Sequence, residues 1–217
     1  MSSTYSSLHS QGTKTVSKLT TVAIAAIAYF VVIIVALHFL RPDLNPISRP
    51  TSEYAVGAYG YLMTSAFFSM SLASGALIIA LYQGVPGPAR SRIGLTLLGI
   101  WAVGLIIAML FPIDLDGAPQ TTAGTIHAIN GPLTFLSLTL GVILVSWRFK
   151  HHKEWRSFHR LAVSLSLVLL LESIAVPVAM ATESGLAGLL QRIFLVTFVT
   201  WFVLTAARLR SIAIKSN

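Results

Sequence analysis

Six long apolar runs determine what this chain can fold into. They cover Leu19–Phe39, Tyr54–Gln83, Ile93–Phe111, Thr122–Trp147, Leu161–Met180 and Ala187–Ala207. A helix needs about 20 apolar residues to cross about 30 Å of hydrocarbon, and every run is close to that length or longer. Only 10% of the residues are charged, whereas a typical soluble domain has about 25%. We therefore predict an all-α, polytopic membrane protein built as a bundle of six transmembrane helices.

Basic residues are distributed unevenly over the segments that connect these runs. With the N-terminus inside the cell, the inner segments hold twelve of the fifteen Lys and Arg residues, namely Lys14, Lys18, Arg90, Arg92, Arg148, Lys150, Lys153, Arg156, Arg160, Arg208, Arg210 and Lys215. The outer segments hold the other three, Arg41, Arg49 and Arg192. Lysine and arginine favour cytoplasmic loops. We therefore expect both termini to be cytoplasmic, in a multi-pass protein of the plasma membrane.

The net charge of +8 follows from this topology and from attraction to anionic lipid, so we expect membrane lipid and not nucleic acid as a partner. Residues 1–18 are polar and rich in Ser and Thr, which predicts a disordered tail. The six-helix domain then covers residues 19–210, and residues 211–217 form a short cytoplasmic tail. Cysteine is absent, which excludes disulfides and thiolate chemistry.

One polar stretch, "FPIDLDGAPQTTAGTIHAINGP" at 111–132, interrupts the apolar sequence. Asp114 and Asp116 follow the third run, and His127 lies about one and a half turns into the fourth. Ionisable groups below the membrane surface are candidates for function. We hypothesise that Asp114 and His127 share one outward-facing polar site, in which the carboxylate orients the imidazole. The alternative is that Asp114 caps the fourth helix and that His127 only satisfies a backbone group.

Small and polar residues recur at three- and four-residue steps along the fourth run, on one face of the predicted helix. This stripe consists of Gly124, His127, Asn130, Gly131, Thr134, Ser137 and Gly141. Such residues let membrane helices pack closely. The second run has a similar glycine-rich pattern, so we expect these two helices to be neighbours. Pro132 and Pro177 are each expected to kink a helix and free one carbonyl.

Glu172 lies within the fifth run, below its outer end. A charged and unpaired carboxylate there would cost a few kcal/mol. Glu172 can remain protonated, or it can pair with Arg192 near the outer end of the sixth run. We expect the pair. The candidate polar site thus comprises Asp114, Asp116, His127, Asn130, Glu172 and Arg192.

The chain resembles a bacterial and archaeal six-pass membrane family catalogued as domain of unknown function 998. The resemblance rests on Phe111-Pro112-Ile113-Asp114, on Gly124 and His127, and on "LRPDLNPIS" after the first run. It extends from about residue 19 to residue 210. The family has no assigned activity, so the resemblance implies only that Asp114 and His127 are the first positions to test.

Four functions fit these patterns. A lipid-interacting, assembly or sensing role requires only the outward-facing polar pocket, with Arg49 or Arg192 available for a phosphate. A small proton-coupled transporter would use Glu172 and the broken helices. A metal-dependent hydrolase would bind zinc through His127 and nearby carboxylates, and a cytochrome would bind haem between His38 and His127. We favour the first, and the sequence indicates no particular cofactor.

Overall fold

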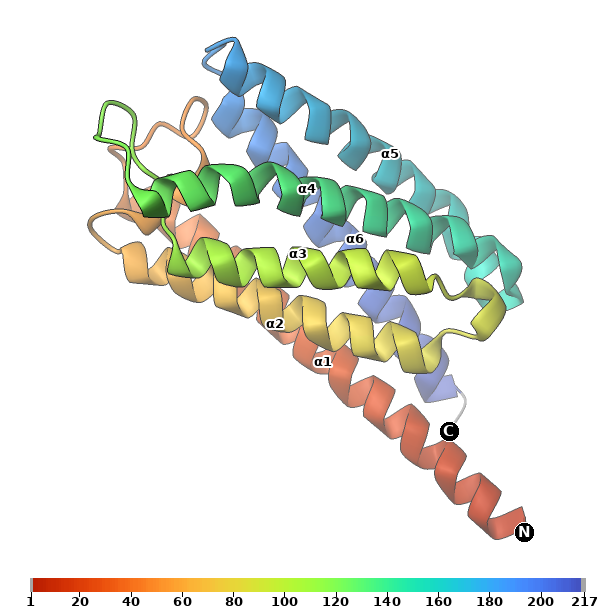
Figure 1. Ribbon diagram of the computed structural model, residues 1–217. Helices are drawn as coiled ribbons and strands as arrows, with labels where there is room; N and C mark the ends of the chain where they lie inside the picture. Colours follow the sequence, from red (N-terminus) through yellow and green to blue (C-terminus); the bar gives the residue numbers. More distant parts are fainter. Residues whose placement is uncertain (1, 216–217) are drawn as a thin grey trace.

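The protein is a bundle of six long helices in the computed structural model, which describes residues 2–215, with side chains from residue 12 onward (Figure 1). The helices are α1 (Ser2–Leu40), α2 (Gly60–Gly84), α3 (Arg92–Leu110), α4 (Thr122–Arg148), α5 (Lys153–Ala181) and α6 (Ala187–Lys215). The connections include three short 3₁₀ helices, η1 (Thr51–Ala55), η2 (Gly87–Ala89) and η3 (Phe149–His151). Each of the six helices contains a segment long and apolar enough to cross a membrane. The predicted six-span fold is confirmed.

The helices follow one another around the bundle in chain order. Each helix packs against the next, and α6 returns to pack against α1, which closes the ring. We call the end that holds the 41–59, 111–121 and 182–186 connections the distal end. The first residues of α1 and the last residues of α6 lie at the opposite, proximal end (Figure 1). Short connections between antiparallel spans account for this sequential arrangement.

The basic asymmetry predicts that the proximal end is cytoplasmic and the distal end external. Reporter fusions placed after Gly117 at the distal end and after Lys153 at the proximal end should therefore report opposite sides of the membrane. We expect an external signal at Gly117 and a cytoplasmic signal at Lys153. The reverse pattern would contradict the predicted orientation and leave the fold unchanged.

Three helices begin several residues away from the predicted start, and one of them, α5, starts at Lys153 instead of Leu161. α1 starts at Ser2, so it extends through the segment that was expected to be a disordered tail. Extending an existing helix is far easier than nucleating one, and no proline interrupts residues 2–40. α2 starts at Gly60 instead of Tyr54, because Tyr59 has a positive φ of 61° and ends any helical continuation from η1.

Large aromatic side chains of α6 fill the middle of the bundle. Phe194, Phe198 and Phe202 follow one another at four-residue steps, and all three are buried. The ring of Trp101 from α3 meets that of Phe198 edge-on, with 5.2 Å between centroids. The indole of Trp101 also joins two helices, since its Nε1 donates to Ser74 Oγ of α2 at 3.0 Å. Such bonds join helices where no water is present.

The small-residue stripe of α4 packs against α3, and not against α2 as the sequence suggested. Gly94 faces Gly141 across this contact, and Gly104 faces Thr134. Nδ2 of Asn130 donates to the carbonyl oxygen of Gly104 at 2.9 Å. A stripe of small residues indicates close packing but not the partner helix, which the short 111–121 connection fixes here.

Candidate functional site

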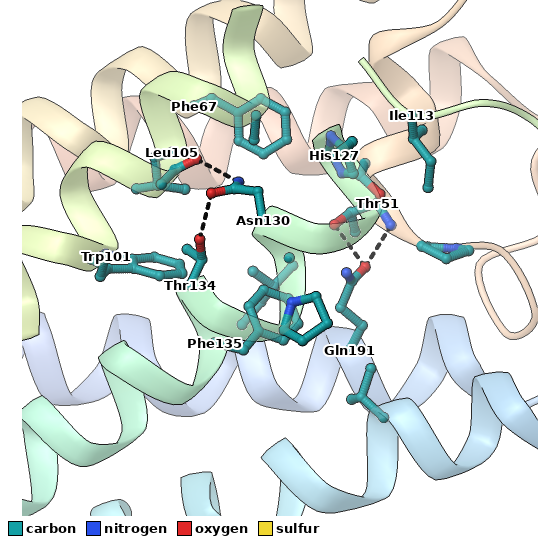
Figure 2. Close-up of a pocket in the computed structure, with 18 of the residues that line it drawn as sticks. Thr51, Phe67, Trp101, Leu105, Ile113, His127, Asn130, Thr134, Phe135 and Gln191 are labelled. Carbon is teal, nitrogen blue, oxygen red and sulfur yellow. Dashed lines mark hydrogen bonds between the residues drawn. The ribbon is translucent and has the colours of Figure 1, made fainter. Parts of the chain in front are cut away.

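A cavity with a volume of about 290 Å³ lies inside the distal half of the bundle. Most of its wall is apolar, with Phe67, Trp101, Leu105 and Phe135 among the side chains (Figure 2). The described residues that line it include no Asp, Glu, Lys or Arg. The sequence predicted a polar pocket, whereas this cavity is a largely hydrophobic space with a few polar groups at one end.

Three polar side chains meet at that end, namely Thr51, His127 and Gln191. Thr51 comes from η1, His127 from α4 and Gln191 from α6, and Thr51 lies between the other two (Figure 2). Each is at least nine-tenths buried, with 3% of Thr51 exposed and 9% of each of the other two. Buried polar groups away from water need hydrogen-bond partners. The bonds made here therefore decide which atoms remain for a ligand.

His127 is oriented by the end of α3. Its Nδ1 lies 2.9 Å from the carbonyl oxygen of Phe111. A carbonyl oxygen only accepts, so Nδ1 carries the proton, and Nε2 of the neutral ring is left as an acceptor. His127 also lines the cavity.

Gln191 is held by η1. Its Oε1 accepts from the backbone N–H of Thr51 at 2.7 Å and from the Thr51 hydroxyl at 2.9 Å. The backbone donor fixes which way the amide faces, so its Nε2 provides two N–H donors on the other side. This arrangement also holds Thr51 and Ser52 over the distal end of the cavity, which both residues line.

Residues 41–59, which we call the distal cap, are fastened to the bundle by arginines. Arg41 donates to the carbonyl oxygens of Val56 at 2.7 Å and Ala58 at 3.1 Å. It also forms an ion pair with Asp43 at 2.8 Å, and this bond lowers the pKa of Asp43. The cap thus closes on itself through one buried guanidinium.

A second arginine of the cap, Arg49, joins two acidic residues. It pairs with Glu53 at 2.6 Å and with Asp116 of the next distal connection. Glu53 is 3% exposed at its side chain, whereas Asp116 is 82% exposed. Burial raises the pKa of Glu53, although its bond to Arg49 acts in the opposite direction. Asp116 is therefore a peripheral member of a salt bridge and does not reach the cavity.

Arg192 fastens the cap to α6. Its Nε donates to His38 Nε2 at 2.7 Å, and Nη1 donates to the carbonyl oxygens of Arg49 at 2.8 Å and Gly188 at 3.0 Å. Its Nη2 donates to the hydroxyl of Tyr54 at 3.0 Å. With Nε2 accepting, Nδ1 of His38 carries the proton that binds the carbonyl of Ile34 at 2.6 Å. Both nitrogens of His38 are occupied, which argues against His38 as a ligand.

The expected pair of Glu172 and Arg192 does not form. Glu172 faces α6 through Thr197, whose hydroxyl donates to Oε1 at 3.2 Å. The other carboxyl oxygen has no partner among the described residues. Arg192 precedes Thr197 by five positions, which is about 7.5 Å along the helix and about 140° around it. The two side chains therefore lie on different faces of α6.

The expected contact between Asp114 and His127 does not form either. Asp114 accepts from the backbone N–H of Thr121 at 2.8 Å and from its hydroxyl at 2.7 Å. Thr121 in turn caps α4 by accepting from the N–H of Gly124 at 3.0 Å. A Cβ atom at Gly124 would overlap the Asp114 carboxylate, so this glycine leaves room for the cap. Asp114 is thus a residue of the helix start, which is the alternative that the sequence allowed.

The bonds from Thr121 lower the pKa of Asp114. A carboxyl whose pKa is lower in the folded state stabilises the fold above its ordinary pKa, and this contribution is lost as pH falls through the lowered value. We expect Asp114→Asn to reduce the melting temperature of the purified protein at neutral pH. The difference from wild type should shrink below about pH 4. A difference that is independent of pH would contradict this role.

Of the six candidate residues, the structure brings only His127 and Asn130 to the cavity wall. Both polar atoms of the Asn130 side chain are already hydrogen-bonded. Its Oδ1 accepts from the Thr134 hydroxyl at 3.1 Å, and its Nδ2 donates to the carbonyl oxygen of Gly104. The described residues contain no group of three His, Cys, Asp or Glu side chains placed to hold a metal ion.

Thr51 and Trp101 were not identified as site residues from the sequence. The feature of the sequence that could have located the cavity was the pair of prolines inside the fourth and fifth runs. Pro132 and Pro177 both line the cavity, so internal prolines in two consecutive spans mark the part of the bundle that is hollow.

A family model described as "Protein of unknown function (DUF998)" matches residues 23–208. No curated protein and no solved structure matches significantly.

Proposed function

The chain belongs to the DUF998 family of membrane proteins of unknown function, and from its geometry we propose that it binds the apolar chain of a membrane amphiphile. The cavity in the distal half is the binding site. The amphiphile enters from the lipid phase, between α4 and α5. This makes membrane lipid the partner class, and no chemical reaction is required of the protein.

One observation carries this proposal, namely that the cavity reaches the lipid-facing surface of the bundle. Five residues line the cavity and are also exposed on the outside of α4 or α5, and they are Ala128, Pro132, Leu136, Pro177 and Met180. The three on α4 are spaced four apart and so form one ridge. A cavity wall that is exposed and apolar provides a lateral opening to hydrocarbon.

The distal end of the bundle offers the amphiphile a much less direct route into the cavity. Thr51, Ser52 and Tyr54 of η1 are 3%, 8% and 1% exposed, so this helix is packed into the bundle where water would otherwise enter. Arg192 and Gln191 hold it there. In the orientation that the basic residues predict, this end is the external face of the plasma membrane. The ligand is then a molecule of the outer leaflet.

The size of the cavity matches a single chain. An apolar cavity of about 150 Å³ holds one benzene molecule, and this cavity has about 290 Å³. It therefore accommodates part of one alkyl or isoprenoid chain, and the remainder extends through the opening into the bilayer. Its lining of aromatic and methionine side chains adapts to such a chain.

Trp101 provides a direct test, because it lines the cavity and is only 2% exposed. Bromine atoms on a chain quench indole fluorescence on contact. A brominated single-chain alcohol added to the detergent-solubilised protein should quench Trp101 saturably, and Trp101→Phe should abolish the saturable component. Trp147 is 55% exposed and accounts for non-saturable quenching, which Trp147→Phe removes. An absence of saturable quenching at Trp101 would refute the proposal.

A further inference from the structure

Two side chains at the polar end of the cavity, each 9% exposed, have a nitrogen that makes no hydrogen bond to another described residue, and these two nitrogens are complementary. Nε2 of His127 is an acceptor, because Nδ1 donates to the Phe111 carbonyl. Nε2 of Gln191 is a donor, because Oε1 accepts twice from Thr51. Both side chains line the cavity, with Thr51 between them (Figure 2). Such groups need partners when they are desolvated.

Charge is absent from this polar end. The nearest charged side chains are engaged elsewhere, since Glu53 pairs with Arg49 and Arg192 binds the cap. Asp114 binds Thr121. A carboxylate or phosphate in the cavity would lose its hydration without gaining a cation, which costs several kcal/mol. The head group that fits here is therefore uncharged.

We infer that the ligand carries a hydroxyl head group, which donates to Nε2 of His127 and accepts from Nε2 of Gln191. The ligand class is thus a neutral, single-chain or isoprenoid alcohol, or a glyceride with a free hydroxyl. This inference rests on the proposed function and names the head group that the same site selects. An ester or an ether accepts but cannot donate, so it leaves the histidine without a partner.

Pro132 and Pro177, which lie at the lateral opening of the cavity, also favour a ligand with a hydroxyl head group. Proline has no N–H, so the carbonyl groups of Ala128 and Ser173 lack the donor four residues later. Ala128 and Ser173 both line the cavity. A hydroxyl that enters between α4 and α5 therefore passes two residues whose carbonyl groups lack this donor. A charged head group finds no cation there either.

The test compares four brominated probes that share one chain and differ in the head group, namely a primary alcohol, its methyl ether, a carboxylate and a plain alkane. Saturable quenching of Trp101 gives the affinity of each probe. One net hydrogen bond contributes about 0.5–1.5 kcal/mol, so the alcohol should bind about threefold to tenfold tighter than the ether. The carboxylate should bind more weakly than the alcohol at pH 8.

Substitution identifies the atoms responsible. His127→Ala should reduce the preference for alcohol over ether to less than about twofold and leave the affinity for the ether similar. Ser173→Ala is the matched control, because Ser173 also lines the cavity but its hydroxyl already donates to Leu170 O at 2.8 Å. This control should retain the full preference. If His127→Ala does not fold, Gln191→Met tests the donor side, because the alcohol and the ether both accept from Gln191 Nε2. This variant should lower the affinity of both probes relative to the alkane and retain the preference for alcohol over ether.

The outcomes separate the two proposals. If none of the four probes quenches Trp101 saturably, the proposed function fails and the inference fails with it. If the four probes bind equally, the cavity binds chains but does not select a hydroxyl, and the inference alone is overturned. A preference for the carboxylate also overturns the inference, as does a full preference for alcohol over ether in His127→Ala, or unchanged affinities of the alcohol and the ether relative to the alkane in Gln191→Met.

Discussion

Replacing Arg192 by alanine is expected to destabilise the protein by about 3 kcal/mol, because hydrogen bonds to charged groups each contribute about 1.5–3 kcal/mol and are not additive. Four acceptors lose their donor in this variant, and they are His38 Nε2, Tyr54 Oη and the carbonyl oxygens of Arg49 and Gly188. Three of them belong to α1 or to the distal cap. The effect should appear as a lower melting temperature and as faster proteolysis within residues 41–59.

Two comparisons show whether Arg192 acts in this way. Arg160→Ala, on the exposed surface of α5, should change the melting temperature little. Glu172→Gln should also be mild, since an amide still accepts from Thr197. The double variant of Arg192→Ala with Glu172→Gln should equal the sum of the single effects within about 0.5 kcal/mol. A coupling energy above about 1 kcal/mol would mean that Glu172 and Arg192 pair after all.

Gly104→Ala is expected to cost about 1–3 kcal/mol by overpacking the contact between α3 and α4. A Cβ atom at this position would lie 2.8 Å from Cγ2 and 2.9 Å from Cβ of Thr134, and still closer to its hydroxyl. Thr134 cannot move aside easily, because it is 5% exposed and its hydroxyl binds Asn130. The melting temperature of the purified variant provides the measurement.

Gly99→Ala is the matched control on the same helix, since no heavy atom lies within 4 Å of a Cβ placed there. It should be neutral, or stabilising by up to about 1 kcal/mol because alanine has the higher helix propensity. Combining Gly104→Ala with Thr134→Ala should partly restore stability by removing the nearest overlapping atoms. Equal effects of the two glycine substitutions would indicate that helix propensity dominates and that the α3–α4 contact is loose.

The spans could be predicted from the sequence because the hydrocarbon thickness sets the length of an apolar helix. The residues that face one another across the bundle could not be predicted, because hydropathy does not specify how each helix is rotated about its axis. Glu172 contacts α6 at Thr197, which is about 7.5 Å along that helix and about 140° around it from Arg192. The small-residue stripe of α4 likewise identified a packed face without naming α3 as its partner.

The site was predictable only in part. His127 and Asn130 were found because polar side chains below the membrane surface are rare. Asp114 was misassigned, since a carboxylate just before a helix serves as well in a cap as in a site. Thr51 could not be found, because its role depends on η1 folding back onto α6 and contacting Gln191. That contact joins residues separated by 140 positions.

The central claim is that the distal cavity holds the apolar chain of a membrane amphiphile, and filling the cavity tests it most directly. Ala108 lines the cavity and is 8% exposed, and a phenyl ring requires about the 150 Å³ that holds benzene. We predict that Ala108→Phe folds and loses saturable quenching of Trp101 by the brominated alcohol. Ile100→Phe, on the exposed side of the same helix at 50% exposure, should bind like wild type. Unchanged binding by folded Ala108→Phe would contradict the claim.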